Sequence, residues 1–347
     1  MPEQDPDATI KVRPPVGTEP GIASEPRAKA NAINPVVLIS GLAGLVVLGG
    51  AAYFLFGPSA VVPSKDATRP PVAVSQAPVP SMVTRLIFPH RGETEILAQQ
   101  VVLPAAVWFS SNPQILVVDY PDLKSQGSAF NRMAAYIEKA GLPRDKVLND
   151  KELYAAILGE GATPQTYYYG HDYRIADIVR FFAAADRQKM ELSQEEERLR
   201  SFLLGIEKLA SSATGAIISI PREGSDTFVD ASGRTSLLRH ELSHGEYFTV
   251  PAYAEFCRRF WSHEMTESDR AGFRHFLSRQ GYDTTDEDLL INEMQAHLMH
   301  TTDPRYFNAR ESGLSSARIK TLRLQFMAEM PPGWLQDAVR TVITKLP

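Results

Sequence analysis

An uninterrupted apolar run near the beginning of the chain restricts its possible folds more than any other feature. The run covers Val36–Phe56 and contains 21 residues without a charged side chain. As a helix it would extend about 31 Å, enough to cross a bilayer core of about 30 Å. A cleavable signal peptide is the alternative, but its apolar region is shorter and follows a short basic segment, whereas 35 residues precede this run. We therefore expect a single transmembrane helix at residues 35–56.

The charges on either side of this run predict its orientation. Four basic residues precede it and two follow it in the next segment: Lys11, Arg13, Arg27 and Lys29, then Lys65 and Arg69. Because positive charge is retained on the cytoplasmic side, we expect the N-terminus in the cytoplasm and the rest of the chain outside it. In a bacterium, the protein would cross the inner membrane once and its large C-terminal part would be periplasmic.

The two segments that flank the apolar run have the composition of unfolded chain. Residues 1–34 are rich in proline, alanine and acidic residues and lack aromatic side chains, so we expect disorder. Residues 57–80 contain six prolines and no helical or strand periodicity, which predicts an extended linker. A globular domain is therefore expected over residues 81–347.

Composition limits what this domain can be. The chain is 44% apolar, which is enough for a sizeable core. Its net charge is -5 and it has no basic stripe, which argues against nucleic acid as a partner. Cys257 is the single cysteine, so an intramolecular disulfide and cysteine-based metal motifs are excluded. Any metal must therefore be bound by His, Asp or Glu side chains.

Sequence patterns in the domain favour an α+β fold. Residues 81–234 mix both kinds of element, and residues 235–347 show helical patterns throughout. We predict strands at 114–120 and 166–169 and a two-stranded hairpin within 215–230. We predict helices at 128–140, 151–158, 175–185 and 194–209. Strands followed by helices are typical of a small sheet packed on a helical half.

The stretch RHELSHGEYF places two histidines four positions apart. Thr235 or Ser236 can cap the helix that contains them. Residues four apart share one helix face, so His240 and His244 can both bind one ion. Glu241 would lie beside that ion, where a general base takes a proton from metal-bound water. The spacing predicts an HExxH zinc site; the alternative is a surface helix whose histidines have no role.

The residues after the motif distinguish the classes of zinc peptidase. Metzincins require a glycine and a third histidine, but Tyr247 and Val250 occupy these positions. An HExxH helix after a strand, with a downstream glutamate on another helix, resembles the zincin metallopeptidases of the gluzincin-like group. The resemblance covers roughly residues 215–300. It implies a zincin-like domain, a Zn²⁺ cofactor, a peptide or protein substrate, and a glutamate as the third zinc ligand.

Two glutamates are candidates for this third ligand. Glu264 follows the second histidine by 20 residues, the spacing of thermolysin-like enzymes, but His263 and Ser268 replace that family's neighbouring Asn and Asp. Glu293 follows the second histidine by 49 residues and has Asn292 before it. It lies in a helix with apolar residues on both sides, and a buried carboxylate requires a cation or a proton. We therefore predict that Glu293 is the ligand, with Glu264 as the alternative.

A zinc ion held by two imidazoles and one carboxylate keeps one position open for water. Glu241 would take a proton from this water and transfer it to the leaving amine. A hydrogen-bond donor would stabilise the oxyanion, and Tyr306, His297 and His300 are the candidates. His297 stands where many gluzincins have an aspartate that supports a zinc histidine. It is either a donor near Glu293 or an ordinary histidine in a polar pocket.

Two further expectations concern residues outside the motif. Ala216–Ile220 is either an edge strand to which an extended peptide substrate adds, or an ordinary core strand. The other four histidines are isolated in sequence and are expected at the surface or in caps: His90, His171, His263 and His275.

Together these features predict a membrane-anchored zinc peptidase that hydrolyses peptide bonds in the cell envelope. The alternative is an envelope scaffold or binding protein with a structural or vestigial zinc site. Glu241 favours the enzyme, because a structural site does not need a base.

Overall fold

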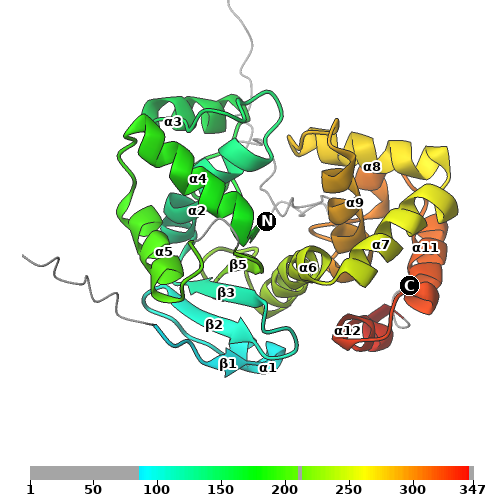
Figure 1. Cartoon of the computed structure of the whole chain (residues 1–347). Coiled ribbons are helices and arrows are strands. Elements are labelled where there is room, and N and C mark those ends of the chain that lie inside the picture. Colours follow the sequence, from blue (N-terminus) through cyan, green and yellow to red (C-terminus); the bar gives the residue numbers. More distant parts are fainter. Residues whose placement is uncertain (1–85, 210–212, 344–347) are drawn as a thin grey trace, which may run out of the picture. The chain divides into compact units, whose positions relative to one another are not determined.

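The computed structural model describes residues 86–209 and 213–343 of the chain. These residues form one sheet with helices on both faces, followed by a run of helices (Figure 1). They confirm the predicted mixed class with a small sheet and a helical C-terminal half. No helix among them is both long and apolar enough to span a bilayer. The predicted disordered segment, transmembrane helix and linker lie outside the described residues.

The sheet has five strands in the described part of the chain, in the order β1-β2-β3-β5-β4. They are β1 (His90–Arg91), β2 (Ala105–Phe109), β3 (Ile115–Tyr120), β4 (His171–Arg174) and β5 (Ala216–Pro221). β3 and β5 form a parallel pair, in a register that places Ile115 beside Ala216. β2 and β4 flank this pair in antiparallel orientation, and β1 runs parallel to β2. β4 is therefore an edge strand of the sheet.

Helices cover both faces of this sheet (Figure 1). α6 packs on one face of the sheet, together with α1. α2 and α4 pack on the other face, and α3 and α5 pack against α2. These helices are α1 (Glu93–Leu97), α2 (Leu123–Ile137), α3 (Asp150–Gly159), α4 (Ile175–Gln188), α5 (Gln194–Gly205) and α6 (Ala231–Thr249).

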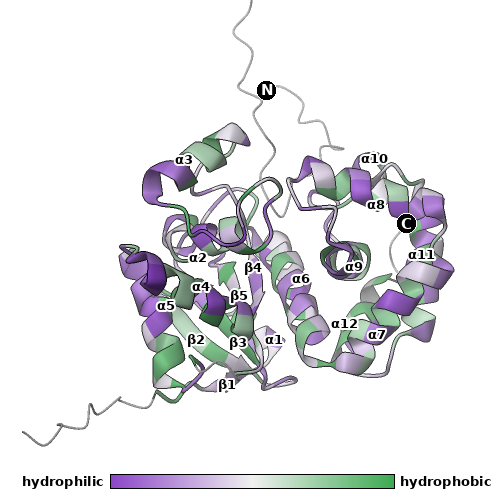
Figure 2. Cartoon of the chain, turned by 45° about the horizontal axis from the view of Figure 1, so that its top comes forward, coloured by the Kyte–Doolittle hydropathy of each residue, from purple (hydrophilic) through white to green (hydrophobic). Residues whose placement is uncertain are grey.

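Burial on both faces explains why the central strands form. Every residue of β3 and β5 is buried, and Figure 2 shows the hydrophobic colour of these strands. Alternate side chains of β3 enter different cores. Ile115 and Val117 pack in the cluster that contains Leu238 of α6, whereas Leu116 and Val118 pack in the cluster formed with α2, α4 and α5. Each such aliphatic side chain stabilises the fold by about 1.5–3 kcal/mol.

The chain after residue 235 is helical, as predicted. Its elements are α7 (Pro251–Arg259), η1 (Phe260–Glu264), α8 (Glu267–Arg279), α9 (Glu287–Gln295), η2 (Ala296–His300), α10 (Ala309–Ser312), α11 (Ser316–Glu329) and α12 (Trp334–Ile343). η1 and η2 are π-helical turns that directly continue α7 and α9. α6, which contains the HExxH motif, lies between the sheet and these C-terminal helices (Figure 1).

Two strand predictions are wrong. The hairpin expected within 215–230 contains one strand, β5, and the residues that follow it form turns. Since β5 pairs with β3 on one side and β4 on the other, Ala216–Ile220 is not the edge strand proposed for substrate. The strand expected at 166–169 begins later, at β4. His171 of β4 is buried, not at the surface, and its Nδ1 lies 3.0 Å from Ser219 Oγ of β5.

Several helix ends differ from the predicted ones, and capping side chains explain the beginnings of α2 and α6. α2 begins five residues before residue 128, since the Asp122 carboxylate accepts a hydrogen bond from the Ser125 amide at 2.7 Å. α6 begins at Ala231 because Asp230 is its cap, so Thr235 and Ser236 lie within the helix and do not cap it. α5 ends at Gly205, before the predicted residue 209.

Candidate metal centre

Two helices bring the predicted ligands together. His240 and His244 lie one turn apart on α6, and their Nε2 atoms are 3.0 Å apart. Glu293 of α9 faces both: its Oε2 is 3.9 Å from His240 Nε2, and its Oε1 is 3.8 Å from His244 Nε2. At most 2% of each side chain is exposed. These separations are close to the roughly 3.3–3.5 Å between atoms that bind one tetrahedral zinc at about 2.0–2.1 Å.

A hydrogen-bond chain sets the tautomer of His240. Its Nδ1 is 2.7 Å from Thr301 Oγ1, and this hydroxyl donates to the Ala296 carbonyl oxygen at 3.0 Å. Since the hydroxyl hydrogen is used on Ala296, Thr301 accepts a hydrogen bond from the Nδ1–H of His240. The lone pair of His240 Nε2 is therefore available for a metal. Thr301 is not among the residues predicted from the sequence.

Burial sets the charge of these groups. It lowers the pKa of His244 to about 4 and the pKa of His240 well below its ordinary value, so both imidazoles are neutral at pH 7. Burial raises the pKa of Glu293 well above its ordinary value, and Glu138 raises it further. Glu293 Oε2 has no hydrogen-bond partner among the described residues. Two neutral imidazoles beside a buried carboxylate fit a divalent cation in both donor type and charge.

Glu241 lies beside these ligands on α6. Its side chain is buried, and its Oε2 has no hydrogen-bond partner among residues 86–209 and 213–343. The carboxylate packs directly against Gly170, because a Cβ atom there would lie 2.0 Å from Glu241 Oε1. Burial raises the pKa of Glu241 well above its ordinary value, and Glu293 adds to this shift. The backbone before β4 thus approaches the carboxylate more closely than any side chain would allow.

Asp172 of β4 is a member of the cluster that was not predicted. Its Oδ2 is 3.7 Å from His244 Nε2. The nearest ligand atoms of Asp172, Glu241 and His244 all lie within 4.8 Å of one another. Asp172 precedes the motif by about seventy residues and shares no spacing pattern with it, so the pairing of β4 with β5 is what brings it here.

The π-helical turn η2 adds a third imidazole to the cluster. His297 Nε2 is 3.5 Å from Glu293 Oε2, and the His297 ring packs edge-on against the rings of His240 and Phe276. Burial lowers the pKa of His297 to about 3. His300 Nε2 lies instead 3.2 Å from the Tyr253 hydroxyl, within the helical half. π-helical turns are frequent at functional sites, and this one directly follows the helix of Glu293.

Two predicted candidates lie outside the cluster. The Tyr306 hydroxyl donates to the Phe228 carbonyl oxygen at 2.6 Å. It lies close to Gly233, about two helical turns before the histidines, so the structure gives no support to Tyr306 as an oxyanion donor. Glu264 ends η1, and its carboxylate accepts a hydrogen bond from Gln325 of α11. Glu264 is therefore placed with α11 and not with the motif histidines.

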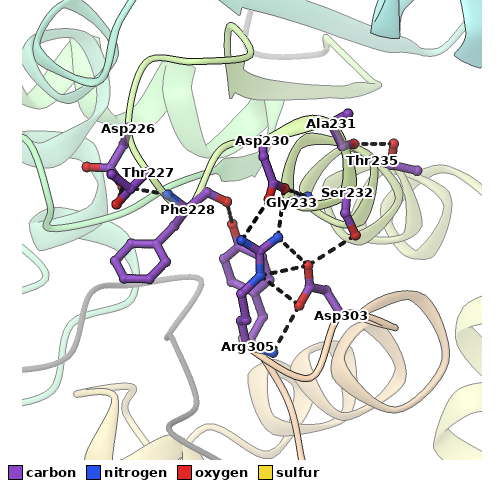
Figure 3. Close-up of polar contacts among 11 residues, drawn as sticks. Asp226, Thr227, Phe228, Asp230, Ala231, Ser232, Gly233, Thr235, Asp303 and Arg305 are labelled. Atoms are coloured by element: carbon purple, nitrogen blue, oxygen red, sulfur yellow. Dashed lines mark hydrogen bonds and ion pairs between the residues drawn. The ribbon is translucent and has the colours of Figure 1, made fainter. Parts of the chain in front are cut away.

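A polar network holds the beginning of α6 (Figure 3). Asp230 caps the helix by accepting a hydrogen bond from the Gly233 amide at 2.8 Å. Arg305, which follows η2 in the chain, pairs with Asp230 at 2.7 Å and with Asp303 at 2.6 Å. Ser232 donates to Asp303 at 3.2 Å. The network joins the motif helix to the segment after η2 and so helps to keep the ligands of both helices in register.

A buried ion pair joins α6 to the sheet. Arg234 donates two hydrogen bonds to the Asp119 carboxylate of β3, at 3.1 and 2.7 Å, and 1% of each side chain is exposed. Arg234 also donates to the Ile96 carbonyl oxygen at 2.9 Å. Removing one partner of such a pair leaves a buried charge and costs about 3–5 kcal/mol. α6 is therefore firmly fixed to the sheet about two turns before His240, the first candidate ligand.

A pocket of about 280 Å³ reaches the cluster, because Asp172 and Asn292 are among its lining residues. β4, α4, α6 and α9 contribute to its wall. Arg174 in this wall pairs with Asp288 at 3.2 Å and lies over the Phe248 ring. The pocket offers a substrate group a path to Asp172.

Comparisons with protein-family models, curated proteins and solved structures give no match for this chain. Two neutral imidazoles and a carboxylate are one of the donor sets found in catalytic zinc sites, and the Glu241 carboxylate lies beside this set.

Proposed function

We propose that this chain is a zinc-dependent peptidase, anchored in a membrane by Val36–Phe56 and acting on peptide bonds in the cell envelope. One observation carries the proposal: His240 and His244, both neutral, face the buried Glu293 while Glu241 lies alongside. The resemblance of the HELSH motif to gluzincin-like enzymes gives the same donor set and the same base.

The ligands and the base have separate tasks in this proposal. His240, His244 and Glu293 would hold the ion, which supplies Lewis-acid chemistry: it polarises a carbonyl group and acidifies water. Glu241 accepts a proton from the attacking water and passes it to the nitrogen of the peptide bond. The nitrogen therefore leaves as a neutral amine and not as an amide anion. Burial raises the pKa of Glu241 well above its ordinary value, which makes this carboxylate a stronger base than an exposed glutamate.

The test is hydrolysis of quenched fluorescent peptides by the purified full-length chain. Wild-type protein should cleave peptides, lose activity to a chelator and regain it with zinc. Glu241→Gln should lower the rate by at least about 100-fold while zinc stays bound. Glu255→Gln is the matched control, because Glu255 is exposed on α7 and its variant should retain the wild-type rate.

Two results would contradict the proposal. Full activity in Glu241→Gln would exclude Glu241 as the base. A wild-type protein that holds zinc tightly but cleaves no peptide would favour the alternative of an envelope scaffold with a structural zinc site.

Membrane anchoring is tested separately. The apolar run of 21 residues supports it. The full-length chain should remain with membranes after a high-salt or alkaline wash, and a chain that lacks residues 35–56 should not. Release of the full-length chain by the alkaline wash would contradict the anchor.

A further inference from the structure

The edge strand β4 presents Asp172 to the metal-ligand cluster. Neighbouring side chains of a strand point to opposite faces, and those of His171 and Tyr173 lie on the α2 side of the sheet. His171 Nδ1 is 3.2 Å from Gln126 Nε2 of α2, and the Tyr173 hydroxyl donates to Glu138 at 3.3 Å. Asp172 therefore faces α6.

Three donor atoms surround His244 Nε2 at similar distances. His240 Nε2 is at 3.0 Å, Asp172 Oδ2 at 3.7 Å and Glu293 Oε1 at 3.8 Å. Donor atoms of one tetrahedral zinc are separated by roughly 3.3–3.5 Å, so the distance from Asp172 to His244 is as compatible with a shared ion as the distance from Glu293 to His244. Glu293 also approaches His240 Nε2 at 3.9 Å, so Asp172 would reach the ion from the His244 side of the cluster.

We propose that Asp172 is a fourth protein ligand of the ion, so that the resting site is closed by His240, His244, Glu293 and Asp172. This inference rests on the proposed zinc site and extends it with a mechanism by which the site is regulated. Distance supports it, because Asp172 and Glu293 are the carboxylates that approach His244 Nε2, at 3.7 and 3.8 Å, and a buried divalent ion is stabilised by carboxylates that contact it.

His297 is the other donor near the ligands, since His297, His240 and Glu293 offer ligand atoms within 4.8 Å of one another, but its side chain is fully buried. Its Nε2 approaches Glu293 Oε2 at 3.5 Å, and its ring is enclosed by Phe276 and Phe307 on the buried side. His297 does not line the pocket, so a group that enters from the pocket would meet Asp172 and not His297.

Exposure identifies Asp172 as the ligand that can be displaced. Its side chain is 13% exposed and lines the pocket, whereas at most 2% of His240, His244 or Glu293 is exposed. Catalytic zinc sites keep an open position and structural sites are closed. Asp172 would therefore hold the site closed until a substrate group enters from the pocket and takes its place, which makes β4 a regulatory element.

The experiment measures metal binding to the full-length chain, with zinc or cobalt alone as the probe. Zinc affinity comes from competition with a chelator, and the visible spectrum of the cobalt-loaded protein reports the ligand set. Asp172→Ala should weaken zinc binding by at least about 10-fold and shift the cobalt spectrum. Asp172→Asn keeps the shape of the side chain and should shift both readouts in the same direction. It replaces Asp172→Ala in the experiment if Asp172→Ala fails to fold. Asp145→Ala removes an exposed carboxylate and should leave both unchanged.

The outcomes separate this inference from the proposed function. If wild type binds zinc and both Asp172 variants match its affinity and spectrum, Asp172 is not a ligand and the zinc site itself stands. If wild type binds no zinc, both proposals fail.

Discussion

Replacing Gly170 by alanine tests whether Glu241 works from the position that the structure gives it. The added Cβ would lie 2.0 Å from Glu241 Oε1, 2.5 Å from Cδ and 2.9 Å from Cγ. Ordinary contact begins at 3.4 Å, so the carboxylate oxygen has to move by about 1.4 Å. A misplacement of about 1 Å can cost about 100-fold in rate, which corresponds to about 2.7 kcal/mol of activation free energy.

The fold should tolerate this substitution better than catalysis does. The clashing atoms belong to the end of a side chain, which can rotate, so we expect the free energy of unfolding to fall by no more than about 1–3 kcal/mol. The assay compares three quantities in Gly170→Ala and wild type: the rate of peptide cleavage, the zinc content and the unfolding free energy. Gly159→Ala is the matched control, because a Cβ at Gly159 meets no atom within 4 Å.

Gly170→Ala should therefore bind zinc, remain folded and lose about 100-fold in rate. A variant with the wild-type rate would refute the argument that Glu241 needs its present position. Loss of zinc together with activity would also refute it, since the clash would then act on the ligands and not on the base.

Three further predictions concern single residues: Thr301, Asp230 and Cys257. Thr301→Val removes the hydroxyl that orients His240 and should weaken zinc binding by about 10–100-fold in chelator competition, whereas Thr301→Ser should retain the affinity. Asp230→Ala removes the cap of α6 and should lower the unfolding free energy by about 1 kcal/mol in denaturant titration at pH 7. A variant at position 230 whose side chain still caps α6 and still pairs with Arg305 should show no such loss. Because the hydrogen bond from Arg305 lowers the pKa of Asp230, this contribution is present above pH 3.8 and is lost as the pH falls below it; a difference that grows on acidification would contradict this. Burial raises the pKa of Cys257, so the thiol should resist alkylation at pH 8 in the native protein and react once it is unfolded; rapid labelling of native protein would contradict the burial of Cys257.

Local patterns were sufficient to predict the motif helix and its partner. The four-residue spacing of His240 and His244 determines one helix face, and the apolar residues around Glu293 indicate a buried carboxylate that lies beside them in the fold. Both inferences need only helical periodicity and the cost of burying a charge.

Residues whose place depends on strand pairing could not be predicted in the same way. Asp172 reaches the cluster because β4 pairs with β5 as an edge strand, and no local pattern gives that order. The continuous apolar character of Ala216–Pro221 fits a strand buried on both faces as well as one half of a hairpin, so the sequence alone does not distinguish the two. Thr301 follows a π-helical turn, which simple helical periodicity does not predict.

Zinc content of the purified full-length chain tests the central claim most directly. Elemental analysis should find about one zinc per wild-type chain and a clear loss in Glu293→Ala, since Glu293 faces both motif histidines. Glu264→Ala should keep its zinc, because Glu264 is bound by Gln325 of α11. Wild-type protein without zinc, or equal zinc in Glu293→Ala and wild type, would contradict the metal centre proposed for this chain.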